Sequence, residues 1–247
     1  MPQEAKNIKE EKKEEYTSSD LIIDIEEMVK AGVYFGHKKS KRHPKMKQYI
    51  FAVKNNIDII DLQKTAEKLK ESLNFIQNIV RNGGDILFVG TKVQAKGLIK
   101  EAAEALKMPY LNERWLGGFI TNFPTMLKRI EYFNGLREKK ESGEAEKYTK
   151  KEKIKLDKEL KSLENKFGGV KDIKNLPKVI FVLDLKKDLL AAKEAKKKGI
   201  TVVAICDTNI NTDFCDFAIP ANDDAVSSIK YILEKVKEAI GQVTNGK

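Results

Sequence analysis

Short apolar runs alternate along the chain with segments whose apolar residues recur every three or four positions. The runs are rich in Ile and Val and occupy residues 57–62, 85–90, 178–184 and 200–207. Runs of this kind are typical of strands that are covered on both faces. The helix-period segments include 64–81 and 223–240, and glycine follows each of them. The alternation predicts an α/β fold with a parallel sheet between two layers of helices.

Residues 126–167 depart from this alternation, because they contain no strand pattern and lie between two predicted strands. Each half of the segment carries a narrow apolar stripe at helical spacing. Thr149 and Glu152 have the spacing of a capping box, which predicts the start of a second helix after the polar loop 141–148. We expect an antiparallel helical hairpin, coiled-coil-like, that projects from the sheet domain.

The same patterns give the domain boundaries. A short helix is predicted from Asp20 to Ala31, where Gly32 ends it. We expect a flexible polar tail at residues 1–19 and another flexible tail at 241–247. Between them, residues 20–125 and 168–240 are predicted to form the two parts of the α/β domain, and residues 126–167 the hairpin insertion. The first twenty residues lack the apolar core of a secretory signal. No apolar run approaches the roughly 18 residues of a membrane span. We expect a cytoplasmic protein without membrane contact.

The charge of the chain is unevenly distributed. Lys and Arg total 47 against 37 acidic residues, a net charge of +10. Such an excess is typical of proteins that bind a polyanion, although a lysine-rich surface is an alternative explanation. Residues 37–49 carry +6 without any acid, whereas the first twenty residues carry −2. The local excess favours RNA phosphate contacts by Lys38, Lys39, Lys41, Arg42, Lys45 and Lys47.

A second candidate RNA-binding segment spans residues 112–124 and contains the only Trp of the chain. It combines two glycines, small polar residues and flanking positive charge, which suits contact with phosphates and sugar edges. Its predicted contacts are Arg114, Trp115, Thr121, Asn122, Lys128 and Arg129. The alternative for the Trp is a buried position in the core.

Gly90, Thr91 and Lys92 follow a predicted strand and open a helix, where backbone amides and a lysine can meet a phosphate. That phosphate would belong to RNA, with Lys92 as a contact, or to a mononucleotide. Neither a GxGxxG nor a P-loop motif is present. The alternative is a tight turn with Thr91 as helix cap.

The remaining reactive side chains give little support for catalysis. His37 and His43 are the only histidines, and their spacing, without an adjacent Cys or carboxylate, is poor for zinc. We expect His43 to contact RNA phosphate or to stack. Cys206 is predicted to be a small buried apolar residue, and two cysteines in a chain of this length indicate a reducing compartment.

Asp184 and Asp207 each end an apolar run, at the edge where open α/β sheets place ligands. If their strands are neighbours, the two carboxylates could hold a divalent cation. The alternative is that each aspartate caps the following turn or helix. No other cofactor is expected.

Several collinear motifs resemble the bacterial small-subunit ribosomal protein two family. They are AGVYFGH (31–37), PKMKQYIF (44–51), IDIIDLQKT (57–65), ILFVGTK (86–92), RWLGGFITNF (114–123), LPKVIFVLD (176–184), VVAICDTN (202–209) and IPANDDAVSSI (219–229). The resemblance extends over about residues 20–240. It departs at Arg42 and His43, where the family often has Trp-Asn, and at Ala221, where the family usually has Gly.

The resemblance implies a flavodoxin-like sheet domain with an inserted helical hairpin. It also implies a structural, non-enzymatic constituent of the small subunit, bound to its ribosomal RNA near the junction of head and body. A further implied role is anchoring the large messenger-binding protein of that subunit. Two other functions fit the residues: a nucleotide-binding α/β enzyme using residues 90–92 with Asp184 and Asp207, and a basic regulator of free messenger RNA.

Overall fold

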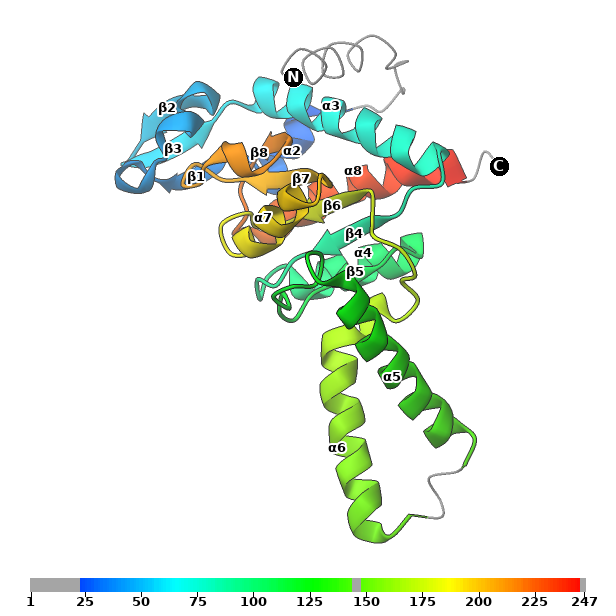
Figure 1. Ribbon diagram of the computed structural model, residues 1–247. Helices are drawn as coiled ribbons and strands as arrows, with labels where there is room; N and C mark the ends of the chain where they lie inside the picture. The colour runs from blue at the N-terminus through cyan, green and yellow to red at the C-terminus, as the bar shows by residue number, and fades with distance from the viewer. Residues whose placement is uncertain (1–22, 144–147, 245–247) are drawn as a thin grey trace.

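The computed structural model describes residues 23–143 and 148–244. The predicted tail 1–19, residues 144–147 of the predicted loop and residues 245–247 lie outside these ranges. Figure 1 shows a sheet domain from which two long helices project.

Five parallel strands form the central sheet in the order β5-β4-β6-β7-β8. They are β4 (Ile86–Val89), β5 (Tyr110–Leu111), β6 (Val179–Val182), β7 (Thr201–Cys206) and β8 (Phe217–Pro220). All residues of β4 and β6 are buried, because helices cover both faces of the sheet. The predicted flavodoxin-like α/β fold with a parallel sheet is confirmed, as are the strands expected at 85–90, 178–184 and 200–207.

Alternate residues of each strand pack into two separate core layers. Ile86 and Phe88 face the layer that contains α2 (Ile25–Ala31), α3 (Leu62–Arg81), α4 (Lys96–Leu106) and α8 (Val226–Thr244). Leu87 and Val89 face the layer that contains α7 (Leu189–Lys197) and the loop before α5 (Phe123–Glu141). The two faces of the sheet therefore present different helices to solvent.

The run 57–62 does not join the parallel sheet, contrary to prediction. It forms β3 (Ile57–Ile60), the middle strand of a separate antiparallel sheet with β1 (Phe35–Lys38) and β2 (Ile50–Lys54). Asn55 and Asn56, both with positive φ, make the two-residue turn between β2 and β3, which is the backbone conformation of a type I′ hairpin. Figure 1 shows this small sheet at one end of the domain.

Two helix ends differ from the predictions. α2 begins at Ile25 rather than Asp20, because the Asp24 side chain accepts a hydrogen bond from the Glu26 amide and caps the helix there. α8 continues to Thr244, so the predicted helix end at residue 240 is wrong, and residues 241–244 belong to the helix rather than to the predicted tail. Val243 packs into the core beyond Gly241, and this packing outweighs the low helix propensity of glycine.

The insertion contains α5, which leads away from the sheet domain, and α6 (Lys150–Phe167), which leads back to it (Figure 1). The predicted capping box is confirmed: the Glu152 amide donates to Thr149 Oγ1, and the Thr149 amide donates to Glu152 Oε2 at 2.9 Å. The Tyr132 hydroxyl donates to Glu159 at 2.9 Å between the helices. Across residues 23–143 and 148–244, no helix is both long and apolar enough to cross a membrane.

Candidate nucleic-acid interface

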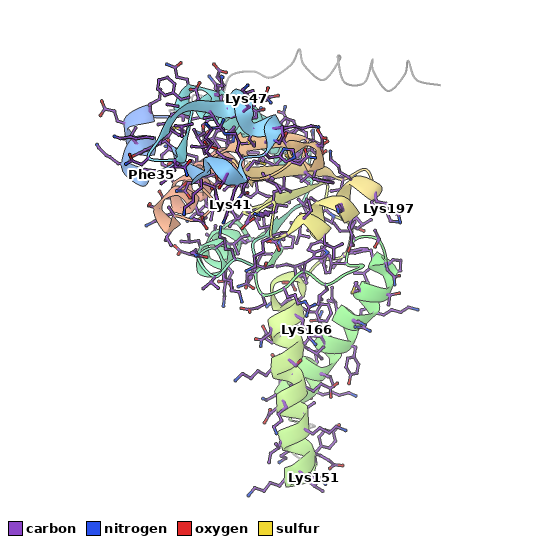
Figure 2. The ribbon with its side chains drawn as sticks, turned by 90° about the vertical axis from the view of Figure 1, so that its left-hand side faces the viewer. Phe35, Lys41, Lys47, Lys151, Lys166 and Lys197 are labelled. Carbon is purple, nitrogen blue, oxygen red and sulfur yellow. The ribbon has the colours of Figure 1, made fainter. Side chains whose placement is uncertain are left out.

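Residues 38–47, here called the basic segment, leave β1 and form the short turns η1 (Lys39–Lys41) and η2 (Pro44–Tyr49) before β2. Four lysines of the segment are exposed and make no salt bridge with the described residues: Lys38, Lys39, Lys41 and Lys47. Lys45 is also exposed and pairs with Asp213. Lys41 and Lys47 are labelled in Figure 2, in the sheet domain. The lysines are therefore available to a polyanion.

The basic segment is held in place by the loop after β7. The His43 amide donates to the Thr208 carbonyl at 2.8 Å, and the His37 amide donates to Thr208 Oγ1 at 2.9 Å. Met46 is fully buried beneath the segment. A Cβ at Gly36 would lie 2.6 Å from Thr208, so this close contact needs glycine. The lysines thus extend from a fixed support.

Two predicted RNA contacts of the segment are used inside the protein. The Arg42 guanidinium donates to the fully buried carboxylate of Asp58, with Nε to Oδ2 at 2.8 Å, and this hydrogen bond raises the pKa of Arg42. His43 Nδ1 accepts from the Lys45 amide and caps η2. Removing Arg42 would leave a buried, unpaired charge. Arg42 is a structural residue, and His43 is half-buried with one ring nitrogen already occupied.

Loop 112–124 is organised around Glu194, a buried residue of α7. Trp115 Nε1 donates to Glu194 Oε1 at 3.1 Å, and the Gly118 amide donates to the same oxygen at 2.8 Å. The amides of Ile120 and Thr121 and the Thr121 hydroxyl donate to Glu194 Oε2. Burial tends to raise the pKa of Glu194, but these hydrogen bonds outweigh it and leave the pKa below its ordinary value.

Trp115 is therefore a core residue, as the alternative interpretation expected, and little of its side chain is left for the predicted contact with RNA. Its side chain is 7% exposed and its ring packs edge-on against Phe119. Thr121 likewise spends its hydroxyl on Glu194. The remaining predicted contacts of this region are exposed, and they are Arg114, Asn122, Lys128 and Arg129.

Thr91 and Lys92, which were predicted to lie at a phosphate site, contact carboxylates of the protein itself. Lys92 Nζ lies 2.7 Å from Asp223, 2.7 Å from Asp224 and 3.2 Å from Asp184. The amide and hydroxyl of Thr91 both donate to the buried carboxylate of Asp188. Phosphate would meet negative charge here, which disfavours the predicted contact of Lys92 with RNA. The nucleotide-binding alternative loses its donors for the same reason.

Burial and mutual repulsion shape the titration of this cluster. Burial and the charges of Asp184 and Asp207 raise the pKa of Asp223 to about 7, although Lys92 acts in the opposite direction. Burial opposes the charge on Lys92, but hydrogen bonds to Asp223 and Asp224 outweigh it and raise the Lys92 pKa. The ammonium is the positive centre on which the buried carboxylates depend.

Asp184 and Asp207, the predicted cation ligands, contact different partners. β6 and β7 are neighbours, but Asp184 turns to Lys92. Asp207 instead groups with His37, Asp223 and Asp224, whose potential ligand atoms lie within 4.8 Å of one another. His37 Nδ1 lies 2.8 Å from Asp207, and this hydrogen bond, against the effect of burial, raises the His37 pKa. Imidazole and carboxylates are ligands suited to a divalent metal. The sequence did not reveal this group, because its members come from three distant segments.

Two further predictions concern Cys206 and Ala221. Cys206 is fully buried, with its sulfur 3.7 Å from the sulfur of Cys215, and both thiols are free. Ala221 is buried and, within the described chain, only Asn55, Asn56 and Lys107 are non-glycine residues with positive φ. The turn at Ala221 therefore does not require glycine.

These features define a class of protein. It is a doubly wound α/β domain in which ion pairs of the protein occupy the sheet edge where such folds usually bind ligands, while the lysines of the basic segment are exposed. Residues 28–242 match the family model described as Ribosomal protein S2. Since the match covers most of the chain, the protein belongs to the ribosomal protein S2 family and is a structural protein of the small ribosomal subunit. The resemblance seen in the sequence motifs is confirmed.

Proposed function

We propose that this protein binds small-subunit ribosomal RNA through the exposed lysines of the basic segment. The observation that carries the proposal is that Lys38, Lys39, Lys41 and Lys47 extend from a fixed support and pair with none of the described acidic residues. Their ammonium groups would neutralise phosphates and release counterions. Arg114, Lys128 and Arg129 would extend the contact, with RNA recognised by shape and by its 2′-hydroxyls.

We propose a structural role without catalysis, for a protein that is ribosome-bound in the cytoplasm. The donors of residues 90–92 are already bound to Asp184, Asp188, Asp223 and Asp224, which disfavours a nucleotide substrate. A regulator of free messenger RNA remains the alternative from another class. Sedimentation separates the two hypotheses, because a subunit protein travels stoichiometrically with small subunits in moderate salt.

The basic segment is tested by replacing Lys39, Lys41 and Lys47 together with Gln. We expect at least about tenfold weaker binding to purified small-subunit ribosomal RNA at moderate salt, and a slope of log K against log salt that is smaller by about 2–3. Filter binding at several salt concentrations measures both quantities. Incorporation into small subunits, followed on sucrose gradients, should fall in parallel.

The matched control replaces Lys70, Lys100 and Lys230 with Gln. These exposed lysines lie on α3, α4 and α8, across the parallel sheet from α7, and their loss changes the net charge equally. The control should bind as the unmodified protein does. Unchanged binding and incorporation of the basic-segment variant would refute the proposed contact.

We also propose that the protein helps to anchor the large messenger-binding protein of the subunit. Apolar side chains of the small sheet are unusually exposed, with Phe51 76% and Phe35 45% accessible, and Figure 2 labels Phe35 at the edge of the molecule. Exposed aromatic residues of this kind are typical anchors of protein interfaces.

Replacing Phe51 with Ser should weaken retention of the messenger-binding protein by about tenfold or more, because an aromatic anchor is lost. Incorporation of the variant into small subunits should be unchanged, since Phe51 contributes little to the core. Immunoblots of gradient-purified subunits measure both. Val93→Ser, at a site 78% exposed, is the control. Full retention by the Phe51 variant would contradict the assignment.

A further inference from the structure

A second group of exposed lysines covers the outer face of α7 and the residue after it. This α7 surface consists of Lys193, Lys196, Lys197 and Lys198. Lys193, Lys197 and Lys198 make no salt bridge with any residue in the described ranges. Neither the charge distribution nor the motifs of the sequence singled out this region.

The acidic residues of the same segment do not reach the surface. Residues 185–198 contain only two acids, Asp188 and Glu194. Asp188 is 2% exposed and accepts hydrogen bonds from Thr91, while Glu194 is 7% exposed and binds loop 112–124. Because both carboxylates point inward, the helix presents only positive charge to solvent.

Helix stability does not account for all of these lysines. Positive charge in the last turn interacts favourably with the helix dipole, which suits Lys196 and Lys197. Lys193, however, stands one turn before Lys197, and like charges four residues apart repel each other. A bound anion would relieve this repulsion.

The α7 surface is joined to the basic segment through η5 (Thr212–Phe214). Lys193 Nζ lies 5.3 Å from the centre of the Phe214 ring, and Lys196 Nζ donates to the Asp213 carbonyl. On its other side, Asp213 pairs with Lys45, whose hydrogen bond lowers the pKa of Asp213. Lys196 Nζ also lies 3.8 Å from Asp216 Oδ1, so two lysines and two carboxylates meet at this junction.

A shallow hollow lies between the basic segment and η5. It is lined by Pro44, Lys45, Lys47, Gln48, Thr212 and Asp213. Lys41, Lys47 and Lys197 all lie in the sheet domain, far from Lys151 at the outer end of α6 (Figure 2). The contacts of Lys45 and Lys196 with Asp213 thus place the two lysine groups on either side of η5.

We propose that the α7 surface is a second phosphate-binding surface that continues the basic segment across η5, so that one folded RNA contacts both. The inference rests on the proposed function, since it names a further part of the same RNA interface. Lysines on a rigid helix would meet phosphates of the RNA backbone, while the hollow beside Lys45 and Lys47 accommodates its curvature.

The test replaces Lys193, Lys197 and Lys198 with Gln in the full chain. Gln preserves helix propensity, and Lys196 is retained because it holds η5. Binding to purified small-subunit ribosomal RNA is measured by filter binding from low to moderate salt. We expect about tenfold weaker binding or more, and a salt slope smaller by about 2–3. Thermal melting confirms that the variant is folded.

A control variant separates a specific effect of the α7 surface from a general effect of charge. The Lys70, Lys100 and Lys230 variant has lost the same charge from the opposite face of the sheet, so its binding should be unaffected. Equal weakening by this control would show a general charge effect and overturn the inference. Unchanged binding by the α7 variant would overturn it as well.

Failure of the inference is distinguishable from failure of the proposed function. If the Lys39, Lys41 and Lys47 variant loses binding while the α7 variant does not, the basic segment binds RNA without α7. If the unmodified protein does not bind the RNA, both proposals fall. If each triple variant weakens binding and their combination weakens it further, the two surfaces act on one RNA.

Discussion

Replacing Lys92 with Met should destabilise the folded protein by about 3–5 kcal/mol at neutral pH, because breaking a buried ion pair leaves an uncompensated charge. Met fills a similar volume, so the effect isolates the ammonium. Lys92 is 15% exposed and contacts Asp184, Asp223 and Asp224. Without it, the carboxylates of Asp184 and Asp223 are buried together with no cation between them.

The pH dependence gives this prediction its sharpest test. Asp223 already has a pKa of about 7 beside Lys92, and loss of the ammonium raises it further. A carboxyl group with a raised folded-state pKa favours folding while it is protonated, and this contribution is lost as pH rises from the unfolded-state pKa through the folded one. The stability deficit of the variant should therefore be larger at pH 8 than at pH 5.

Urea denaturation of both proteins at pH 5, 6, 7 and 8 measures the deficit. Adding Asp223→Asn to the Lys92 variant removes one of the unpaired charges and should recover part of the lost stability. A deficit that is the same at every pH would contradict the electrostatic explanation, and so would a Lys92 variant as stable as the unmodified protein.

The parallel sheet was predictable because a strand that is buried on both faces consists of consecutive apolar residues. β4, β6 and β7 are continuous apolar runs, since neither side of these strands meets water. β3 also contains three isoleucines, yet Asp58 lies among them, and Asp58 pairs with Arg42 of the basic segment. Composition alone does not show whether such a polar residue interrupts a strand or anchors it.

The interface was predictable only in part, because local sequence shows charge but not its partner. The lysines of the basic segment are as exposed as expected, whereas Arg42 and Lys92 are bound to carboxylates distant in sequence. The α7 surface was not predicted for the opposite reason: Asp188 and Glu194 offset part of its positive charge in the sequence but are buried in the fold.

Glu194 illustrates how much of loop 112–124 depends on a residue that sequence inspection passed over. Its position within a lysine-rich helix is typical of a solvated charge, yet its carboxylate accepts five hydrogen bonds from the loop. The glycines fit this arrangement, because Gly118 has φ +85° and donates its amide to the carboxylate. The loop that resembled an RNA-binding motif is thus held by an internal anion.

Replacing Glu194 with Ala should therefore destabilise the protein by at least about 3 kcal/mol, because several buried donors lose their acceptor together. Glu194→Gln retains one acceptor oxygen and should lose about half as much. Trp115 is the only Trp and donates to Glu194, so its fluorescence during urea denaturation reports on this loop directly. Glu101→Ala, at an exposed position of α4, should change stability by no more than about 0.5 kcal/mol.

Acid titration separates the charge of Glu194 from its packing. Its pKa is lowered in the folded protein, so the stability it contributes is present above the unfolded-state pKa and is lost as pH falls through the lower folded-state value. The Gln variant lacks this contribution, and the stability gap between it and the unmodified protein should narrow as the solution is acidified below about pH 4. A gap that stays constant into acid would mean that the side chain acts through shape alone. If it narrows, the ionised carboxylate itself holds the loop.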